Sequence, residues 1–557
     1  MSSIQTENYR RLEVFAKSEH GSAGAVIAKK KGTGESAIYP AGEHQYRLLK
    51  IPLEEDSEWE VSLNDCRVSI AYLSGCSGIM EQGVRYLEYR NGDWIKTDDL
   101  GKWYDTPNRE QFHFNPYKNW INDPNGLCWF KGYYHLYYQA NPHAQKWDHM
   151  YWGHAASRDL IHWVHLPYVL EPQEEILNAR DKKGGAFSGC AVAQEDKILF
   201  YLTRHLGPSE DTEEDTVQYQ TMAVSEDSLE LKEENRIITK PDTTFSYNFR
   251  DPKVTWRDGV WNMVIGTRVN TVPSVVRYTS DDLLNWDYKG VLMEERTEGV
   301  YTFECPDFFP VSEKKAALVG SWMFYVDEER RFQPTYYYIG EVLDGRMYTE
   351  YRGLYDFGSN FYAVQSFEHE GRRIAIGWAA DSYLEHEPEE NGAYGSMALP
   401  REIFLKNGKL YRKPCSEIYG QIEHCYLDVP GQKVELTHLN NNCYYAKMEF
   451  TGETDFTILL GKSEAGSIKL IRKGTQLRMK TDGVKSKYVK CITQIEHLEK
   501  IEIFVDRRMV EVFVNDGEEA GTKLFYQDKN DGIFTAEFET EKKVESIQIY
   551  GMRGIWR

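Results

Sequence analysis

Long apolar runs, an apolar N-terminus and positive charge are all scarce in this sequence of 557 residues. No run approaches the roughly 18 apolar residues that a membrane-spanning helix needs, so we expect no transmembrane segment. Residues 1–11 are polar and lack the apolar stretch of a secretory signal peptide, which predicts a cytoplasmic protein. The 87 Asp and Glu residues outnumber the 66 Lys and Arg residues, and the net charge is -21. This acidity argues against nucleic acid or an anionic membrane as the main partner.

Paired cysteines are also missing from the sequence. The nine cysteines are an odd number, and no two of them stand in a Cys-x-x-Cys arrangement. This pattern argues against a disulfide framework and against a zinc site. It suits a protein that stays in a reducing cytoplasm.

Aromatic residues, by contrast, are abundant, at 14% of the chain with 38 Tyr and 14 Trp. This excess favours β-structure, and aromatic faces also pack against the C–H groups of sugars. The chain is too long for one core and long enough for two or three domains. Residues 1–105 contain alternating apolar runs, for example at 59–63 and 66–73, but no cluster of catalytic residue types. We predict that 1–105 forms a small accessory β-domain.

A weak internal repeat covers residues 106–420. Its unit is a hairpin with a polar turn, and the copies lie at 129–136, 195–202, 256–263, 311–322 and 367–378. A Ser-x-Asp segment follows the hairpin at 157–163, 225–231 and 280–286. The repeat is long enough for four short strands, so five copies predict a five-bladed β-propeller. A β-sandwich with chance similarity between its hairpins is the alternative.

Residues 421–557 lack this repeat. They contain short alternating strands, such as 501–505 and 510–514, which are separated by a turn at 506–508. We predict a C-terminal β-sandwich here. The expected architecture is therefore all-β, with an accessory domain at 1–105, a five-bladed propeller at 106–420 and a β-sandwich at 421–557.

The segment Trp120-Ile121-Asn122-Asp123-Pro124-Asn125-Gly126 is the most informative in the chain. Pro124 fixes its own φ and favours an extended Asp123, while Asn125-Gly126 is a strong turn signal. We predict a turn that holds the Asp123 carboxylate at the mouth of the hairpin that follows. Taken alone, an Asp in such a turn is more often a cap for its own backbone than a catalyst.

Two further carboxylates occur at the same position relative to a hairpin of the repeat as Asp123 does. Asp251, in Arg250-Asp251-Pro252, and Glu304, in Glu304-Cys305-Pro306, each precede a later hairpin, as Asp123 does. Since the inner strands of a propeller surround one axis, we expect the three acids to meet in one funnel. Such a trio could hold a hard cation or could form a glycosidase site. Arg250 favours the glycosidase, because it would neutralise Asp251 and form a clamp for sugar hydroxyls.

These three motifs resemble the signature blocks of the family 32 glycoside hydrolases, which include invertases, inulinases, levanases and sucrose-6-phosphate hydrolases. Phe187-Ser188-Gly189, Phe361-Tyr362-Ala363 and Leu399-Pro400-Arg401-Glu402 also resemble family blocks. The resemblance covers about residues 110–557. It implies a five-bladed propeller followed by a β-sandwich, in agreement with the repeat, and it implies an enzyme that needs no metal or cofactor.

The resemblance also implies a role for each matching residue. Asp123 would be the nucleophile of a retaining reaction, Glu304 the acid and then the base, and Asp251 a stabiliser of the transition state. The pocket for the fructosyl unit would be lined by Trp120, Asn122, Gln139, Trp147, Phe187, Ser188 and Arg250. Cys190 and Asn360 depart from the family pattern, and we expect them to affect the leaving-group side.

The expected activity is an exo-acting β-fructofuranosidase that releases fructose from sucrose or short fructo-oligosaccharides. Three alternatives stay open: hydrolysis of sucrose 6-phosphate, transfer of the fructosyl unit to another sugar, and a sugar-binding propeller without catalysis. A small carbohydrate is the expected partner, and the sequence leaves open whether the protein forms a homo-oligomer.

Overall fold

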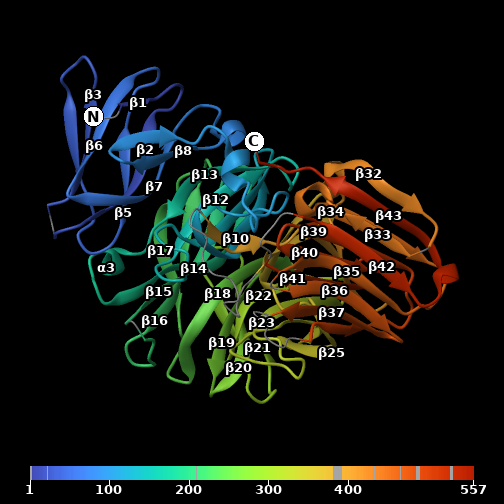
Figure 1. Ribbon diagram of the computed structural model, residues 1–557. Coiled ribbons are helices and arrows are strands. Elements are labelled where there is room, and N and C mark those ends of the chain that lie inside the picture. Colours follow the sequence, from blue (N-terminus) through green and yellow to red (C-terminus); the bar gives the residue numbers. More distant parts are fainter. Residues whose placement is uncertain are drawn as a thin grey trace.

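Three groups of β-sheets follow one another in this computed structural model, as the colours from blue to red show in Figure 1. The structure describes residues 3–21, 23–208, 210–379, 392–431, 433–464, 466–483, 490–526 and 531–556. A small β-sandwich comes first, a ring of five sheets follows, and a larger β-sandwich packs beside the ring. The predicted fold class is confirmed. The domain boundaries at 105/106 and 420/421 stay a proposal, and both fall outside the strands.

The N-terminal sandwich consists of two antiparallel sheets with strand orders β1-β6-β3-β4 and β5-β2-β7-β8-β9. Its strands are β1 Ser3–Gln5, β2 Arg11–Ser18, β3 Ala25–Lys30, β4 Ser36–Pro40, β5 Arg47–Pro52, β6 Glu58–Asn64, β7 Cys66–Ser74, β8 Arg85–Arg90 and β9 Asp93–Lys96. The short helix α1 (Ile79–Gln82) lies between β7 and β8, and the short helix α2 (Leu100–Tyr104) precedes the ring. No helix in the described part of the chain is long and apolar enough to cross a membrane.

The ring is a propeller of five antiparallel sheets, which we number blades I to V in chain order. Blade I contains β10 Asn119–Phe130, β11 Tyr133–Asn141, β12 Tyr151–Ser157 and β13 Trp163–Leu170, and the short β28 (Ala393–Tyr394) pairs with β10. Blade II contains β14 Lys182–Ala193, β15 Ile198–Pro208, β16 Val217–Ser225 and β17 Lys232–Thr239, and helix α3 (Glu174–Leu177) precedes it. Blade III contains β18 Phe245–Arg257, β19 Val260–Val269, β20 Val272–Ser280 and β21 Asp287–Glu294.

Blades IV and V complete the ring. Blade IV contains β22 Thr302–Pro310, β23 Lys315–Met323, β24 Thr335–Leu343 and β25 Arg346–Leu354. Blade V contains β26 Tyr362–His369, β27 Arg372–Ala379, β30 Arg401–Lys406 and β31 Lys409–Pro414, with β29 (Ser396–Met397) paired to β27. Every hairpin predicted from the repeat joins the first two strands of a blade.

The Ser-x-Asp segments form the turns between the third and fourth strands of blades I to III. In blade III, Ser280 donates a hydrogen bond to Asp282 (3.0 Å), and Asp282 accepts the backbone N–H groups of Leu284 (2.9 Å) and Asn285 (2.8 Å). Leu283, at the centre of this turn, is buried in the core. The Ser-x-Asp repeat therefore marks a hydrogen-bonded turn that buries one side chain, which is Leu160 in blade I, Ser228 in blade II and Leu283 in blade III.

Each inner strand of the propeller has a β-bulge at the same depth. Two consecutive residues on the inner strand oppose a single residue on the second strand, and the bulged pairs are 122–123, 187–188, 251–252, 305–306 and 363–364. The first bulge residue has a left-handed backbone in three blades, with φ of 63° at Asp251, 51° at Cys305 and 53° at Ala363. A bulge breaks the alternation of a strand and re-aims side chains, so five of them surround the propeller axis with re-aimed residues.

The turn predicted at 120–126 is wrong, because these residues belong to strand β10. Two successive bulges lie there, one between Ile121 and Pro124 and one between Asn125 and Cys128, and Gly126 has φ of 52°. Bulges and tight turns both use residues that tolerate positive φ, and both accommodate proline. The residues at 120–126 are therefore equally compatible with a tight turn and with bulges in a strand.

The C-terminal sandwich has two six-stranded sheets with orders β32-β43-β34-β39-β40-β41 and β33-β42-β35-β36-β37-β38. The first contains β32 Ile422–Val429, β34 Cys443–Phe450, β39 Lys500–Asp506, β40 Met509–Val514, β41 Glu519–Leu524 and β43 Val544–Met552. The second contains β33 Val434–Thr437, β35 Phe456–Ser463, β36 Gly466–Lys473, β37 Gln476–Gly483, β38 Ile492–Gln494 and β42 Ile533–Phe538. The predicted strands at 501–505 and 510–514 are β39 and β40, which pair as a hairpin.

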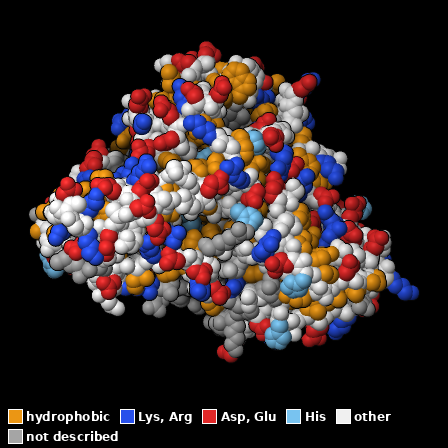
Figure 2. All heavy atoms as spheres, turned by 90° about the horizontal axis from the view of Figure 1, so that it is seen from above, with side chains coloured by type: hydrophobic (Ala, Val, Ile, Leu, Met, Phe, Trp, Pro, Cys, Tyr) orange, Lys and Arg blue, Asp and Glu red, His pale blue; other side chains and the backbone are white. Residues whose placement is uncertain are grey.

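The surface carries charges of both signs. Figure 2 shows acidic and basic side chains interspersed over the face seen from above, with apolar side chains between them. The nine cysteines are free, and eight of them are buried. Buried thiols of this kind pack as small apolar groups.

A buried charge network joins the propeller to the C-terminal sandwich. His113 contacts Asp506 through Nδ1 (2.8 Å) and Glu511 through Nε2 (2.9 Å). Arg401, from blade V, donates to Glu511 (2.7 Å) and to Asp356 (2.9 Å). These side chains are almost completely buried. Removing one partner of such a network would leave an uncompensated buried charge, which makes the interface specific.

This network predicts how stability depends on pH. Burial lowers the pKa of His113, but Asp506 and Glu511 outweigh burial and raise it from 6.5 to about 9. Burial raises the pKa of Glu511, but Arg401 and His113 outweigh burial and lower it from 4.5 to about 2. The contribution of His113 is complete below pH 6.5 and is lost as pH rises through 9; that of Glu511 is complete above pH 4.5 and is lost as pH falls towards 2. Both contributions are complete only between pH 4.5 and 6.5.

We expect the thermal unfolding midpoint of the wild type to decline between pH 6.5 and 9, as about 3 kcal/mol from His113 is lost. The His113→Gln variant should be less stable and should show a flatter decline over this range. His424→Gln, which changes an exposed histidine, should keep the wild-type profile. Calorimetric scans across the pH range measure the effect, and identical slopes for wild type and His113→Gln would contradict it.

Candidate active site

Asp123 lies at the bulge of blade I, where four side chains surround its carboxylate. Ser188 donates to Oδ2 (2.6 Å), and the Cys305 thiol donates to the same oxygen (3.3 Å). Asn122 donates to Oδ1 (3.2 Å), and Gln139 approaches Oδ2 at 3.5 Å. Three of these four partners are themselves bulge residues, and Gln139 is the residue opposite the bulge of blade I.

The ionisation of Asp123 reflects a balance between burial and these donors. Burial raises its pKa above 3.8, the hydrogen bond from Ser188 lowers it, and the nearby charge of Glu304 raises it again. The net direction is upward. A carboxylate in this setting depends on its donors to stay ionised.

Asp251 lies at the bulge of blade III and is the most deeply buried of the three acids. Its backbone N–H donates to Thr203 (2.9 Å), and its Oδ2 accepts the backbone N–H of Cys305 (2.8 Å). Burial raises its pKa; Arg250 opposes this rise, while Glu304 and Asp123 add to it, and the result is about 7. The left-handed φ of Asp251 fits the bulge and directs its carboxylate towards the other two acids.

Glu304 immediately precedes the bulge of blade IV. Arg250 donates to its Oε1 through Nε (3.1 Å) and Nη2 (2.9 Å), and the Tyr362 hydroxyl donates to its Oε2. Its side chain is 18% exposed, which places it on the solvent side of the other two acids. The sequence interpretation paired Arg250 with Asp251; in the structure the guanidinium hydrogen-bonds Glu304 instead.

Cys305 connects the three acids. Its thiol reaches Asp123, its backbone N–H reaches Asp251, and its neighbour in the chain is Glu304. Carboxylates from blades I, III and IV therefore converge on one dipeptide. The convergence predicted from the repeat is present in the structure.

The remaining predicted pocket residues extend from Asp123 along a hydrogen-bonded wall. Trp120 donates to Asn122 (2.8 Å), Asn122 donates to Gln139 (3.1 Å), and Gln139 donates to Ser188. All four side chains are buried. Because each amide is held by its neighbours, the wall presents fixed donors and acceptors to a ligand.

Trp147 and Phe187 form the outer, aromatic part of the wall. Their ring centroids are 6.0 Å apart at an angle of 76°, and Phe187 stacks on His205 at 4.4 Å. Trp147 is 41% exposed, so it marks the rim of the site. Aromatic surfaces of this kind suit the C–H faces of a sugar.

One residue beyond the bulges, three buried polar side chains contact one another. Lys253, Asp307 and Gln365 occupy corresponding positions in blades III, IV and V. The Lys253 ammonium lies 3.1 Å from Asp307 and 3.2 Å from the Gln365 oxygen. Gln365 also donates to the backbone carbonyl of Cys305 (3.2 Å). All three side chains are buried, and each follows directly on the bulge of its inner strand.

Sequence reasoning missed several residues of this site. Tyr362 was part of a recognised motif but had no assigned role, and the contacts of Cys305 and Thr203 were not foreseen. One signal was available: Thr203 and Gln139 occupy the same position opposite the bulge in successive blades. Aligning the second strands of the repeat would therefore have pointed from Gln139, which was predicted, to Thr203.

Cys190 and Asn360, the two residues that depart from the family pattern, do not lie on the leaving-group side of the site. The Cys190 sulfur is buried and accepts the backbone N–H of Val254 (3.2 Å). Asn360 is buried and accepts hydrogen bonds from Lys523 (3.0 Å) and from the backbone of Leu524 (3.2 Å). Asn360 therefore belongs to the contact between propeller and sandwich, and Cys190 to the core between blades II and III.

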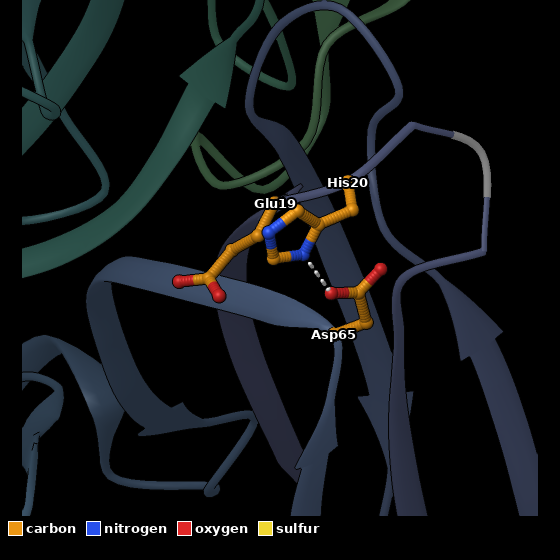
Figure 3. Close-up of side chains that lie close together, drawn as sticks. All are labelled: Glu19, His20 and Asp65. Atoms are coloured by element: carbon orange, nitrogen blue, oxygen red, sulfur yellow. Dashed lines mark hydrogen bonds and ion pairs between the residues drawn. The ribbon is translucent and has the colours of Figure 1, made fainter.

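One group of possible metal ligands occurs among the described residues, outside the propeller. Glu19, His20 and Asp65 bring three ligand atoms within 4.8 Å of one another (Figure 3). His20 contacts Asp65 at 2.6 Å, and the Glu19 carboxylate lies on the other side of the imidazole. Glu19 and His20 are exposed, so the group is an ordinary surface ion pair with an additional acid nearby.

Comparison with known proteins agrees with this geometry. The model of the glycosyl hydrolases family 32 N-terminal domain matches residues 113–414, and the C-terminal model of the family matches 433–551. The chain belongs to glycoside hydrolase family 32. The resemblance inferred from the motifs is confirmed.

Relatives of this family 32 enzyme match most of its length. A sucrose-6-phosphate hydrolase from Zymomonas mobilis is 30% identical over 445 residues, which cover 74% of this chain and 84% of the relative. A raffinose invertase from Escherichia coli is 30% identical over 446 residues, with 74% and 89% covered. The solved structure of a family 32 glycoside hydrolase from Bifidobacterium adolescentis has a TM-score of 0.92, 30% identity and complete coverage of both chains. The protein is a glycoside hydrolase of the β-fructofuranosidase type.

The contact between Ser188 and Asp123 predicts a change in the pH dependence of this glycoside hydrolase. The Ser188 hydroxyl lowers the pKa of Asp123, so Ser188→Ala should raise it. The acidic limb of kcat/KM should then move to higher pH by about one unit, because the carboxylate is protonated earlier as pH falls. Ser225→Ala, which changes a serine in an outer turn of the same blade, should leave the limb in place. An unshifted limb in Ser188→Ala would show that this hydroxyl does not set the ionisation.

Proposed function

We propose that the protein is a retaining, exo-acting β-fructofuranosidase that releases fructose from sucrose or short fructo-oligosaccharides. The observation that carries this proposal is the convergence of Asp123 and Asp251 on the Glu304-Cys305 dipeptide. A retaining glycosidase needs one carboxylate as nucleophile and a second carboxyl group as acid and base. The nine free cysteines support the proposed cytoplasmic location.

In the first step, Asp123 attacks the anomeric carbon of the fructosyl unit. A C–O bond forms between the carboxylate and that carbon, the glycosidic C–O bond breaks, and Glu304 gives its proton to the departing oxygen. The position of Glu304 on the solvent side of Asp123 suits this role, because the leaving group has to depart towards solvent.

In the second step, Glu304 takes a proton from water while the water oxygen attacks the same carbon. The bond to Asp123 breaks, and fructose leaves with its original configuration. Asp251 would accept hydrogen bonds from fructose hydroxyls and would stabilise the positive charge that develops in both transition states. Arg250 would orient Glu304 through its two hydrogen bonds.

The buried cluster of Lys253, Asp307 and Gln365 supports exo action. We infer that these three contacting side chains block the axis below the acids, so that a substrate enters the propeller from one side. A blind pocket accommodates the terminal unit of a substrate, and the rest of the substrate stays at the rim.

The covalent step can be tested with β-fructofuranosyl fluoride, whose leaving group needs little help from an acid. Glu304→Gln should accumulate the fructosyl-enzyme, because the base for its hydrolysis is gone. Mass spectrometry after acid quenching should find one fructosyl group on the peptide that contains Asp123. In the double variant with Asp123→Asn the label should disappear, and a label that persists would exclude Asp123 as the nucleophile.

Hydrolysis of sucrose 6-phosphate is the second candidate, because that activity gives the Zymomonas relative its name. The loop between β15 and β16 carries five carboxylates within residues 210–215. It is held near the site, since Asp211 contacts His205 (3.0 Å), on which Phe187 stacks. Two lysines that could attract a phosphate, Lys182 and Lys183, stand at the start of β14, but they are fewer than these five carboxylates. We therefore propose that the substrate is unphosphorylated, because this loop repels a phosphate group.

The expected kcat/KM on sucrose is roughly tenfold higher than on sucrose 6-phosphate at low salt, and the difference should shrink as salt screens the loop. The variant Glu214→Gln/Asp215→Asn should gain on the phosphorylated substrate and stay unchanged on sucrose. Steady-state kinetics on both substrates measure the ratio. Faster hydrolysis of sucrose 6-phosphate by the wild type would make the second candidate the correct one.

A further inference from the structure

Two aromatic side chains lie at the mouth of the site beside Glu304. Tyr301 immediately precedes β22, three residues before Glu304, and Phe324 immediately follows β23, the strand that pairs with β22. The Tyr301 backbone N–H donates to Met323 (3.3 Å), which brings the two chain segments together. Their ring centroids are 5.7 Å apart at an angle of 47°.

This aromatic pair is connected to the groups that hold Glu304. Asn248 donates to the Tyr301 hydroxyl (3.3 Å) and accepts a hydrogen bond from Arg250 (2.6 Å). The sulfur of Met323, next to Phe324 in the chain, accepts another hydrogen bond from Arg250 (3.1 Å). Arg250 in turn binds Glu304. Arg250 therefore links the Glu304 carboxylate to Asn248 and Met323, the two residues that contact or adjoin the aromatic pair.

Phe324 is a large apolar residue that is exposed to solvent and has an unusual backbone conformation. Its side chain is 57% exposed, and its backbone has φ of 56°, a conformation that bulky residues rarely adopt. Tyr301, by contrast, makes a cation–π contact, because the Arg268 guanidinium lies over its ring at 4.6 Å from the centroid. The pair thus presents an apolar ring to solvent beside the site, and an apolar surface held in place at an active site is typical of a ligand contact.

The loop that carries Phe324 is fixed at its far end by the C-terminal sandwich. Asp327 and Arg331 form a buried pair at 2.7 Å, and Arg331 donates to the backbone carbonyl of Ile492 (3.3 Å). The backbone N–H of Lys490 donates to the carbonyl of Glu329 (3.1 Å). The loop that carries the exposed ring is therefore held at its far end by contacts with the C-terminal sandwich.

We propose that Tyr301 and Phe324 form a platform for the sugar ring of the leaving group. This inference rests on the proposed function, in which Glu304 protonates the leaving oxygen and the leaving sugar lies next to that carboxyl group. One face of the sugar packs against the exposed Phe324 ring, while Tyr301 supports that ring from the side of the site. Phe324 is then a specificity-determining residue, and the preferred substrates are fructosides whose leaving group is itself a sugar.

Two substrates that differ only in the leaving group test the platform. Sucrose has a sugar ring to stack, whereas β-fructofuranosyl fluoride has none. Phe324→Ala should lower kcat/KM on sucrose by about tenfold, the effect of losing one aromatic contact, and should leave kcat/KM on the fluoride unchanged. Phe324→Tyr keeps a ring and should retain wild-type rates on both substrates. Tyr348→Ala, which removes an exposed ring from the outer strand of the same blade, should also match the wild type.

Each other outcome has a definite meaning. An equal loss on both substrates would show that Phe324 supports the fold of the site and not the leaving group, and an unchanged rate on sucrose would show that no stacking occurs; either result overturns the platform. A wild type that cleaves neither substrate would overturn the proposed function itself, and the platform with it. A wild type that cleaves both, with a Phe324→Ala loss confined to sucrose, supports both.

Discussion

A β-bulge at one depth in each inner strand is the constraint from which the active site follows. A regular strand would alternate its side chains between the two neighbouring blades, and no two consecutive residues could face the axis together. The extra residue of a bulge breaks this alternation, so Asn122 and Asp123 both reach the site from blade I, and Asp251 reaches it from blade III. Proline is tolerated at these positions because a bulge leaves one N–H out of the ladder, as at Pro252 and Pro306.

The fold was predictable because the propeller repeats its hairpins, and the three acids were predictable because they share one phase of that repeat. The local geometry around Asp123 was not, because Pro124 and Asn125-Gly126 satisfy a turn and a bulge equally well. Contacts between blades were also beyond the sequence. The bond from Arg250 to Glu304 joins residues 54 positions apart, which meet because the inner strands of blades III and IV pack against each other.

Burial raises the pKa of Asp123 and of Asp251, and the protein opposes this rise unequally at the two carboxylates. Asp123 has donors from Ser188, Cys305 and Asn122 around its two oxygens, which is what an ionised nucleophile requires. Asp251 has a single backbone donor, and burial raises its pKa to about 7. The difference follows from position, because Asp251 lies deeper and its neighbours Asp123 and Glu304 carry like charge. Arg250 partly neutralises the trio, and among the described residues it is the one guanidinium that hydrogen-bonds to it.

The C-terminal sandwich contributes to the site without entering it. Arg401 and His113 lock blade V and the start of the propeller to Asp506 and Glu511, which keeps the ring closed where its first and last blades meet. A second contact, from Arg331 to the carbonyl of Ile492, braces the loop of blade IV that leads to Phe324. A ring of five blades has to hold Asp123 and Glu304 at a fixed separation although they come from different sheets. Bracing the ring from outside supplies rigidity that the bulged inner strands, with their interrupted ladders, cannot supply themselves.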